Sequence, residues 1–241
     1  MKRRLSKLIL LISFAVACVS LFKLTDLYAE DVRNQQTIRE ANGLYSPTAE
    51  QTGVEAKFAA LRKINQDVVG WLQIDSIKVS YPVAQAEDND YYLNRNWKGE
   101  ESRAGSIFID YRNDLALEPE HIILYGHRMN DGSMFGQLKR YLDEDFFKEN
   151  RSFDFETQAQ DYRAEIFSVY VTTTDDYYIQ TDFDRQQAYE SFLRMIQGRS
   201  HFTTDTIVTE QDQILTLSTC DYTLDPEEGR LVVHAKIKKR V

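Results

Sequence analysis

Cysteine, proline and glycine are all scarce in this sequence of 241 residues, which contains 2, 4 and 10 of them. Such low proline and glycine contents exclude a collagen-like chain and argue against a largely disordered one. The sequence also has no internal repeat and no low-complexity tract. Its length and its hydrophobic content of 42% instead predict one globular domain with additional segments.

The two cysteines lie in different surroundings. Cys18 is part of an apolar stretch near the N-terminus, whereas Cys220 ends the string Thr-Leu-Ser-Thr-Cys at residues 216–220. In an exported chain with Cys18 in the membrane, the body would hold one thiol and could form no intradomain disulfide. Such a thiol is either a small buried hydrophobic residue or a reactive group, and the count alone leaves both open.

Positive charge is also scarce outside the N-terminal segment. The net charge is -9, and residues 1–29 hold five basic residues and one acidic residue. The rest of the chain therefore carries 24 basic and 37 acidic residues. Because nucleic-acid binding requires a basic surface that matches the phosphates, we expect no nucleic-acid partner.

The one long apolar run spans residues 5–24. Its 20 residues are enough to cross about 30 Å of hydrocarbon as a helix. Lys7 and Lys23 lie near its ends, where their side chains can reach the membrane interface. Basic residues precede the run and acidic residues follow it, which predicts a cytoplasmic N-terminus and an extracellular body. We therefore expect residues 1–29 to form a cytoplasmic tip and a transmembrane anchor.

Cleavage of this segment is the alternative. Residues 15–17 (Ala-Val-Ala) could serve as a signal-peptidase site, and Cys18 directly after them would suit a lipoprotein. Both cuts would divide the apolar run and leave residues 19–22 still apolar, so we favour a single-pass anchor in the cell membrane. Residues 30–52 are polar and predict a juxtamembrane stalk, which leaves residues 53–241 as the extracellular domain.

The remaining sequence alternates short strands with a few helices. Apolar residues recur with helical spacing at 54–65, 133–148 and 184–197. Strands are expected at 68–74, 77–83, 106–110, 122–125, 162–173, 213–219 and 231–237. Many short strands with inserted helices predict a mostly β fold in the form of a closed or nearly closed barrel.

Three residues whose side chains could take part in catalysis stand at ends of these strands, namely His127, Cys220 and Arg230. A thiol becomes a strong nucleophile as its thiolate, and an imidazole can accept the proton and later return one to a leaving amine. A guanidinium can stabilise the oxyanion of acyl transfer or orient a peptide. Each residue alone could also be an ordinary surface side chain. Gly126 is expected to permit a tight turn before His127.

The other histidines give weaker signals. His121 directly precedes a strand, and we expect it at the surface. His234 lies within a strand among apolar neighbours, which favours a structural role, and His201 lies in a loop. The run Glu-Asp-Asn-Asp at residues 87–90 suggests a calcium site, but it lacks the glycine and the final glutamate of an EF-hand loop.

Several strings occur in a consistent order over about residues 55–241. Leu-Ser-Thr-Cys at 217–220 resembles the Leu-x-Thr-Cys signature of sortases, and Ile-Leu-Tyr-Gly-His at 123–127 resembles the histidine segment of class B sortases. Arg230 follows Cys220 by ten residues, as in that class. Further similar strings lie at 64–71, 81–83, 105–110 and 172–183. The resemblance implies a closed β-barrel of about eight strands, N-terminal helices and a helix inserted before the strand of the catalytic cysteine.

The resemblance also implies a membrane-anchored cysteine transpeptidase of Gram-positive bacteria. His127 would be the acid and base, Cys220 the nucleophile, and Arg230 the clamp for the substrate and the oxyanion. Groove positions implied in the same way are Asn94, Thr174, Tyr178, Ile179, Ser218, Thr219 and Asp221. The family implies no cofactor and no metal.

Class B sortases cleave a C-terminal sorting motif of secreted proteins, of the type Asn-Pro-x-Thr-x, through a cysteine thioester. The resemblance therefore implies transfer of the acyl group to a peptidoglycan-precursor amine, which anchors surface proteins to the cell wall. A pilin lysine as acceptor, in pilus polymerisation, is the close alternative. A catalytically silent binding barrel and a plain cysteine protease are further alternatives from other functional classes.

Overall fold

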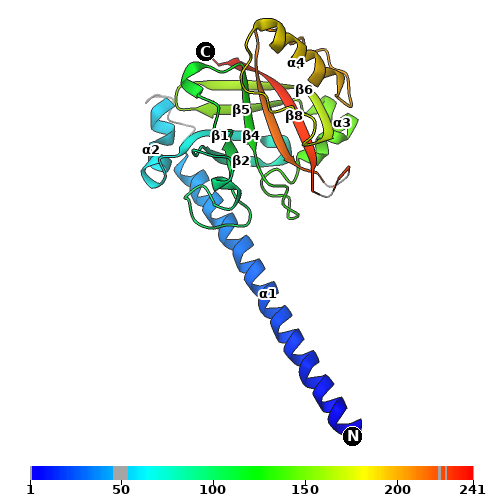
Figure 1. The fold of residues 1–241 in the computed structure, drawn as a ribbon. Coiled ribbons are helices and arrows are strands. Elements are labelled where there is room, and N and C mark those ends of the chain that lie inside the picture. The colour runs from blue at the N-terminus through cyan, green and yellow to red at the C-terminus, as the bar shows by residue number, and fades with distance from the viewer. Residues whose placement is uncertain (1, 46–53, 222–223, 226, 241) are drawn as a thin grey trace.

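The computed structural model describes residues 2–45, 54–221, 224–225 and 227–240. A rounded body carries one long N-terminal helix, α1 (Lys2–Leu44), whose first half extends away from it (Figure 1). The short strands of the body form a sheet that closes on itself. Residues 46–53, which include part of the expected stalk, lie outside the described residues.

The described residues form a barrel in the order β1-β2-β3-β4-β7-β8-β6-β5, with β5 paired to β1. The strands are β1 (Val68–Ile74), β2 (Val79–Ala84), β3 (Ile107–Ile109), β4 (His121–Tyr125), β5 (Ser152–Thr157), β6 (Asp161–Thr173), β7 (Gln213–Cys220) and β8 (Gly229–Lys239). The pairs β2/β3 and β4/β7 are parallel, and the others are antiparallel. Closure leaves no unpaired sheet edge and confirms the predicted mostly β barrel.

Alternate residues of the strands fill the inside of the barrel. Leu217 lies opposite Val233 on β8 and beside Leu124 on β4, and all three are fully buried in one core cluster. The intervening residues of β7 face outward, because successive side chains of a strand point to opposite faces. Cys220 therefore shares the outer face of β7 with Ser218.

Helix α4 (Gln186–Gly198) lies between β6 and β7 in the sequence, which confirms the inserted helix. Its apolar face packs on the outside of the barrel, where Tyr189, Phe192 and Ile196 join one cluster with Ile214 and Val232. Figure 1 shows α4 above the strands, on the side away from the protruding part of α1. This helix covers the barrel next to the beginnings of β4 and β7, where the Tyr189 hydroxyl bonds to Glu120 O and Asp212 O.

The single helix expected at 133–148 is wrong. The structure has a 3₁₀ segment, Leu138–Leu142, followed by the short helix α3 (Glu144–Glu149). Asp143 separates them, because its extended backbone ends the first element while its carboxylate accepts a hydrogen bond from Phe146 N of α3. Strand β5 was not predicted, although its buried residues alternate as a half-buried strand requires.

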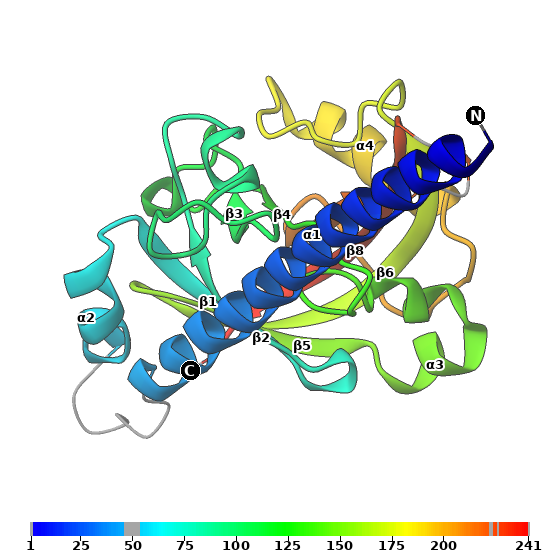
Figure 2. The ribbon, with the colours of Figure 1, turned by 90° about the horizontal axis from the view of Figure 1, so that it is seen from below.

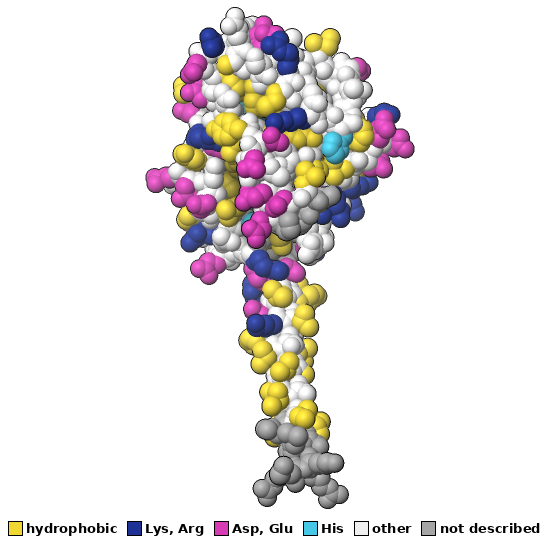
Figure 3. All heavy atoms as spheres, turned by 45° about the vertical axis from the view of Figure 1, so that its right-hand side comes forward, with side chains coloured by type: hydrophobic (Ala, Val, Ile, Leu, Met, Phe, Trp, Pro, Cys, Tyr) yellow, Lys and Arg dark blue, Asp and Glu magenta, His cyan; other side chains and the backbone are white. Residues whose placement is uncertain are grey.

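Helix α1 combines an exposed apolar half with a half that packs on the barrel. The helical stretch Ile9–Leu44 contains an apolar window with a mean hydropathy of 1.9, none of which is buried. The protruding part carries a surface of hydrophobic side chains (Figure 3). Its length and composition make it a candidate membrane span.

The C-terminal part of α1 crosses beneath the body, as Figure 2 shows from below. Thr37 O accepts a hydrogen bond of 2.9 Å from the indole N–H of Trp97. Just after the helix, the ring of Tyr45 stacks on Trp71 of β1 at a centroid distance of 4.2 Å. Helix α2 (Val54–Ile64) adds buried Phe58 to the same cluster. The region expected to be a stalk thus contacts the barrel directly.

Candidate active site

The topology brings the three predicted chemical residues to one end of the barrel. Strands β4, β7 and β8 are consecutive neighbours in the sheet. Cys220 is the last residue of β7, and its cross-strand partner on β8 is Arg230. His127 follows the end of β4, where Tyr125 pairs with Ser218 and Gly126 N donates to Ser218 O at 3.3 Å.

His127, Cys220 and Arg230 all line a cleft of about 280 Å³. Five of the predicted groove residues line it as well, namely Thr174, Tyr178, Ile179, Ser218 and Thr219. The remaining lining residues are Asn89, Asp90, Leu93, Phe108, Tyr125 and Gly126. The cleft is therefore open at the strand ends and bounded by the segments around residues 89–93 and 174–179.

The imidazole of His127 is oriented by the backbone. Its Nε2 lies 2.7 Å from Leu93 O, and because a carbonyl oxygen only accepts, Nε2 must carry a proton. The other ring nitrogen, Nδ1, has no hydrogen-bond partner among the described residues. The structure has no turn at residues 126–127, where a tight turn was expected, and the φ of Gly126 lies outside the left-handed region. Glycine is needed because a Cβ there would lie 2.8 Å from the Phe135 ring.

The guanidinium of Arg230 is held by the turn that precedes β8. Its Nη1 donates to Gly229 O at 2.9 Å and to Glu227 O at 3.1 Å. Gly229 itself must lack a side chain, because a Cβ would lie 1.8 Å from Asp221 O. This close backbone contact places Arg230 directly across from Cys220, which is partly exposed.

The predicted groove residues form hydrogen bonds with one another and with the barrel. The hydroxyls of Tyr178 and Ser218 lie 2.9 Å apart, and burial raises the pKa of Tyr178, so it is a neutral phenol at pH 7. Thr174 bonds to Glu228 through both its backbone N–H and its hydroxyl. The buried Thr219 hydroxyl has no hydrogen-bond partner among the described residues.

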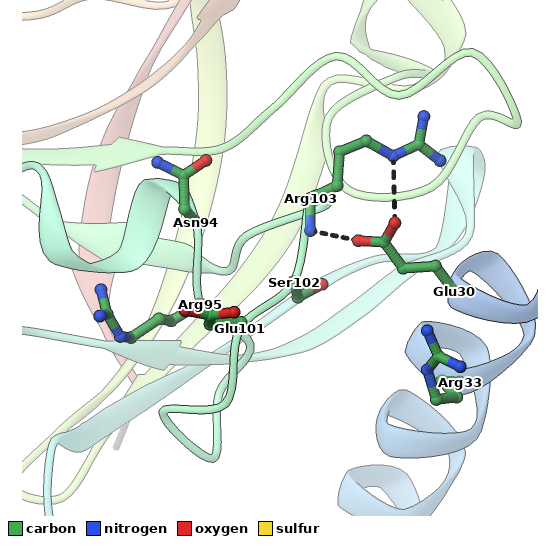
Figure 4. A pocket seen from close by; sticks show the side chains of 7 residues that line it. All are labelled: Glu30, Arg33, Asn94, Arg95, Glu101, Ser102 and Arg103. Atoms are coloured by element: carbon green, nitrogen blue, oxygen red, sulfur yellow. Dashed lines mark hydrogen bonds and ion pairs between the residues drawn. The ribbon is translucent and has the colours of Figure 1, made fainter. Parts of the chain in front are cut away.

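Two predicted groove residues lie elsewhere. Asn94 lines a separate pocket of about 430 Å³ between α1 and the loop at residues 94–103. Figure 4 shows this pocket, with Glu30 bonded to Arg103 across it. Asp221 is 1% exposed, and its carboxylate pairs with Arg128 at 2.7 Å instead of lining the cleft.

Sequence reasoning missed the contribution of residues 89–93. The run at 87–90 was considered only for calcium, yet Asn89 and Asp90 line the cleft. Leu93 provides both lining and the acceptor for His127. No local pattern marks these roles, since they depend on the contact between this loop and the end of β4. Within the described residues, no group of three His, Cys, Asp or Glu side chains could hold a metal ion.

A surface position for His121 is wrong. The side chain is fully buried, because β4 begins at His121 and places it under the segment that joins β6 to α4. The structural role expected for His234 agrees with its complete burial and its hydrogen bonds to Thr216 and Tyr170.

Comparison with known proteins assigns this architecture to a family. A Sortase domain model matches residues 72–238. Sortase B of Listeria monocytogenes is 41% identical over 240 residues, which are 98% of this chain and 98% of that protein. Sortase B of Bacillus anthracis, solved in complex with AAEK1, has a TM-score of 0.81 and 52% identity, covering 88% of this chain and 100% of that one.

A Staphylococcus aureus sortase B–substrate complex is also similar, with a TM-score of 0.83 and 37% identity. The match covers 88% of this chain and all of that one (100%). These relatives match nearly their whole length, and the barrel, the inserted helix and the cleft are those expected of one enzyme class. The chain belongs to the sortase B family of cysteine transpeptidases.

Proposed function

We propose that Cys220, His127 and Arg230 carry out the transpeptidation. The observation that carries this proposal is their convergence on one cleft from three neighbouring strands. The Cys220 thiol first transfers its proton to Nδ1 of His127, which gives a thiolate and an imidazolium. The thiolate attacks the carbonyl carbon of the scissile peptide bond, and negative charge develops on the carbonyl oxygen. Arg230, as the cross-strand neighbour of Cys220, stabilises that oxyanion.

His127 then exchanges the proton. Because Leu93 O holds Nε2–H, Nδ1 is the atom that donates a proton to the departing amine. Collapse of the tetrahedral intermediate breaks the C–N bond and leaves a thioester on Cys220. An acceptor amine gives its proton to His127, attacks the thioester and releases the Cys220 thiolate with a new peptide bond.

The donor substrate is a C-terminal sorting motif of secreted proteins, of the Asn-Pro-x-Thr-x type. The S. aureus relative solved as a substrate complex supports a peptide substrate. The cleft offers apolar surface from Leu93 and Ile179 and polar groups from Asn89 and Thr174. Such a mixture suits an extended peptide with proline and threonine side chains.

The acceptor is an amine of a peptidoglycan precursor. A sortase B structure solved in complex with triglycine supports a glycine amine, and it matches this chain with a TM-score of 0.80 and 37% identity over 89% of this chain and 99% of that one. The sortase B relatives do not favour the pilin alternative. The protein thus anchors secreted proteins to the cell wall.

Residues 5–24 anchor the enzyme as a single span of the cell membrane, with a cytoplasmic N-terminus and residues 53–241 outside. The exposed apolar half of α1 supports the span, and the distribution of charge around it supports the orientation. Protease added to intact cells should digest the body and leave residues 1–7 protected. Release of a soluble body would instead support cleavage after Ala17.

The reaction is tested with residues 30–241, a fluorogenic sorting peptide and triglycine as the acceptor. Mass spectrometry should detect an acyl adduct that Cys220→Ala abolishes, and His127→Ala and Arg230→Ala should lose most turnover. Full activity of Cys220→Ala would refute the mechanism. Hydrolysis without any triglycine product, even at saturating triglycine, would identify a protease instead.

A further inference from the structure

One wall of the cleft is a segment between β6 and α4 rather than a part of the barrel. Tyr178 and Ile179 of this segment line the cleft. Arg112, just after β3, donates to Ile179 O at 2.9 Å, and the same guanidinium pairs with the buried carboxylate of Asp110 at 2.7 Å. The Arg112 side chain, itself paired with Asp110, thus holds the backbone of this wall at Ile179.

The next carbonyl along the wall is held by His121. Its Nδ1 lies 2.6 Å from Gln180 O, and its Nε2 lies 2.6 Å from the hydroxyl of Thr216. Thr216 precedes Ser218 by two residues on β7, so both face the same side of the sheet. Ser218 bonds to Tyr178 at 2.9 Å, and the wall is therefore fixed at three successive residues.

These contacts continue through the interior as one hydrogen-bonded chain. The hydroxyl of Thr216 also lies 2.6 Å from Nδ1 of His234, whose Nε2 lies 2.9 Å from the Tyr170 hydroxyl. Thr216 and both histidines are 0% exposed, and Tyr170 is 2% exposed. Each ring nitrogen thus has a partner, as buried polar groups require.

The donor and acceptor of every hydrogen bond in the chain follow from the carbonyl at its end, Gln180 O. Gln180 O can only accept, so His121 Nδ1 carries the proton and Nε2 of the neutral ring accepts from Thr216. The Thr216 oxygen must then accept from Nδ1–H of His234, whose Nε2 accepts from Tyr170. Burial lowers the pKa of His121 to about 4 and that of His234 well below 6.5, so both rings are neutral at pH 7.

A buried chain of this kind fixes a tautomer rather than a charge. Each donor has one acceptor, so Nδ1–H of His121 points at Gln180 O and at no other group. An apolar residue at 121 would fill the same space and leave that carbonyl without its donor. The chain therefore connects the outer face of the sheet, beneath α4, to the wall of the cleft.

We propose that His121 is a positioning residue of the transpeptidase, which holds residues 178–180 in the conformation that receives the sorting peptide. This role rests on the proposed function, in which the peptide lies against Tyr178 and Ile179. His121 touches neither the peptide nor the reacting atoms. Its effect is expected on peptide recognition, while the reactivity of the Cys220 thiol toward small reagents stays the same.

Two matched variants separate positioning from packing. The amide nitrogen in His121→Asn takes the place of Nδ1 and can still donate to Gln180 O. In His121→Gln, the amide takes the place of Nε2, so it keeps Thr216 and loses Gln180 O. Both remove the ring and its packing against Phe192. The full-length chain in detergent is assayed for KM, kcat, thermal midpoint and alkylation of Cys220 by iodoacetamide.

His121→Gln should raise KM for the sorting peptide about tenfold, since a buried carbonyl is left without a donor. His121→Asn should stay within about twofold of the wild type, because that hydrogen bond is retained. Alkylation rates should not change in either variant. Equal KM values for the two variants, or a wild-type KM in His121→Gln, would overturn the proposal.

Hydrogen exchange of the amides of residues 178–182 reads the wall without any substrate. Exchange should be faster in His121→Gln than in His121→Asn, and equal rates would again overturn the proposal. If the wild-type chain shows no Cys220-dependent transfer, the proposed function is refuted. The exchange rates of the two His121 variants still decide whether His121 positions the wall. If His121→Gln does not fold, the exchange experiment uses Thr216→Val instead, and Thr216→Ser is its control. Amide exchange at residues 178–182 should then be faster in the valine variant only.

Discussion

Asp221, the residue after Cys220, forms an ion pair with Arg128, the residue after His127, with 2.7 Å between Asp221 Oδ2 and Arg128 Nη1. The carboxylate side chain is 2% exposed and the guanidinium side chain is 24% exposed. The pair joins the end of β7 to the loop that follows β4. It therefore sets the distance between the two segments that carry the thiol and the imidazole.

Asp221→Asn should weaken this connection while keeping the shape of the side chain. The substitution removes the negative charge from a largely buried pair, and the partial exposure of Arg128 limits the loss of unfolding free energy to about 1–2 kcal/mol. Urea unfolding should show this loss, and acylation of Cys220 should slow. The double variant Arg128→Gln/Asp221→Asn should lose less stability than the sum of the single variants, and strict additivity would contradict the coupling.

Arg230→Lys should lower kcat strongly and change the stability of the fold little. Lysine keeps the charge but lacks the planar fork, and it cannot hold the two carbonyl contacts of Arg230 while it faces the cleft. Loss of a preorganised oxyanion donor costs about 100-fold in kcat. Steady-state kinetics measure the effect, and Arg163→Lys, at an exposed position of β6, is the control. A kcat near the wild-type value would exclude Arg230 as the oxyanion partner.

Stability should fall as the pH falls from about 6.5 to about 4. In this interval the unfolded chain protonates His121 and His234, whereas the folded chain resists because burial lowers both pKa values. Asp110 opposes and Arg112 adds to this effect at His121, and His121 and Arg199 add to it at His234. At about 1.4 kcal/mol per pKa unit, His121 alone accounts for a loss of about 3 kcal/mol in the free energy of unfolding across this pH interval.

Urea unfolding at pH 7 and at pH 4.5 measures this dependence. His121→Asn should flatten it, because one buried imidazole is removed while the carboxylates stay the same. A parallel loss in the wild type and His121→Asn would show that other groups, such as the ion-paired carboxylates, cause the acid sensitivity.

Tyr45→Ala should destabilise the barrel although Tyr45 lies outside it. The ring stacks on Trp71 and packs near Phe58, and the hydroxyl bonds to Glu156. We expect a loss of about 3 kcal/mol from the buried aromatic side chain. Thermal unfolding of the full-length chain checks this, with Tyr28→Ala on the exposed part of α1 as the control. Equal midpoints for Tyr45→Ala and the wild type would show that the contact of Tyr45 with Trp71 does not support the fold.

Local patterns accounted for much of the fold. Alternation and apolar periodicity lie within a few residues, so they identified most strands and helix α4. The expected helix at 133–148 failed because Asp143 can both end one element and cap the next. The apolar spacing continues through that position and cannot show the break.

The sequence by itself determined that one thiol, one histidine and one arginine stand at strand ends in a sortase-like order, after an apolar run long enough to span a membrane. Only the tertiary structure decided which side chains meet. His127 and Cys220 are 93 residues apart, and they share a cleft because β4 and β7 pair in parallel. The same pairing buries His121 beside Thr216 and turns Asp221 toward Arg128. Contacts of this kind depend on the packing of distant strands, and no local spacing records them.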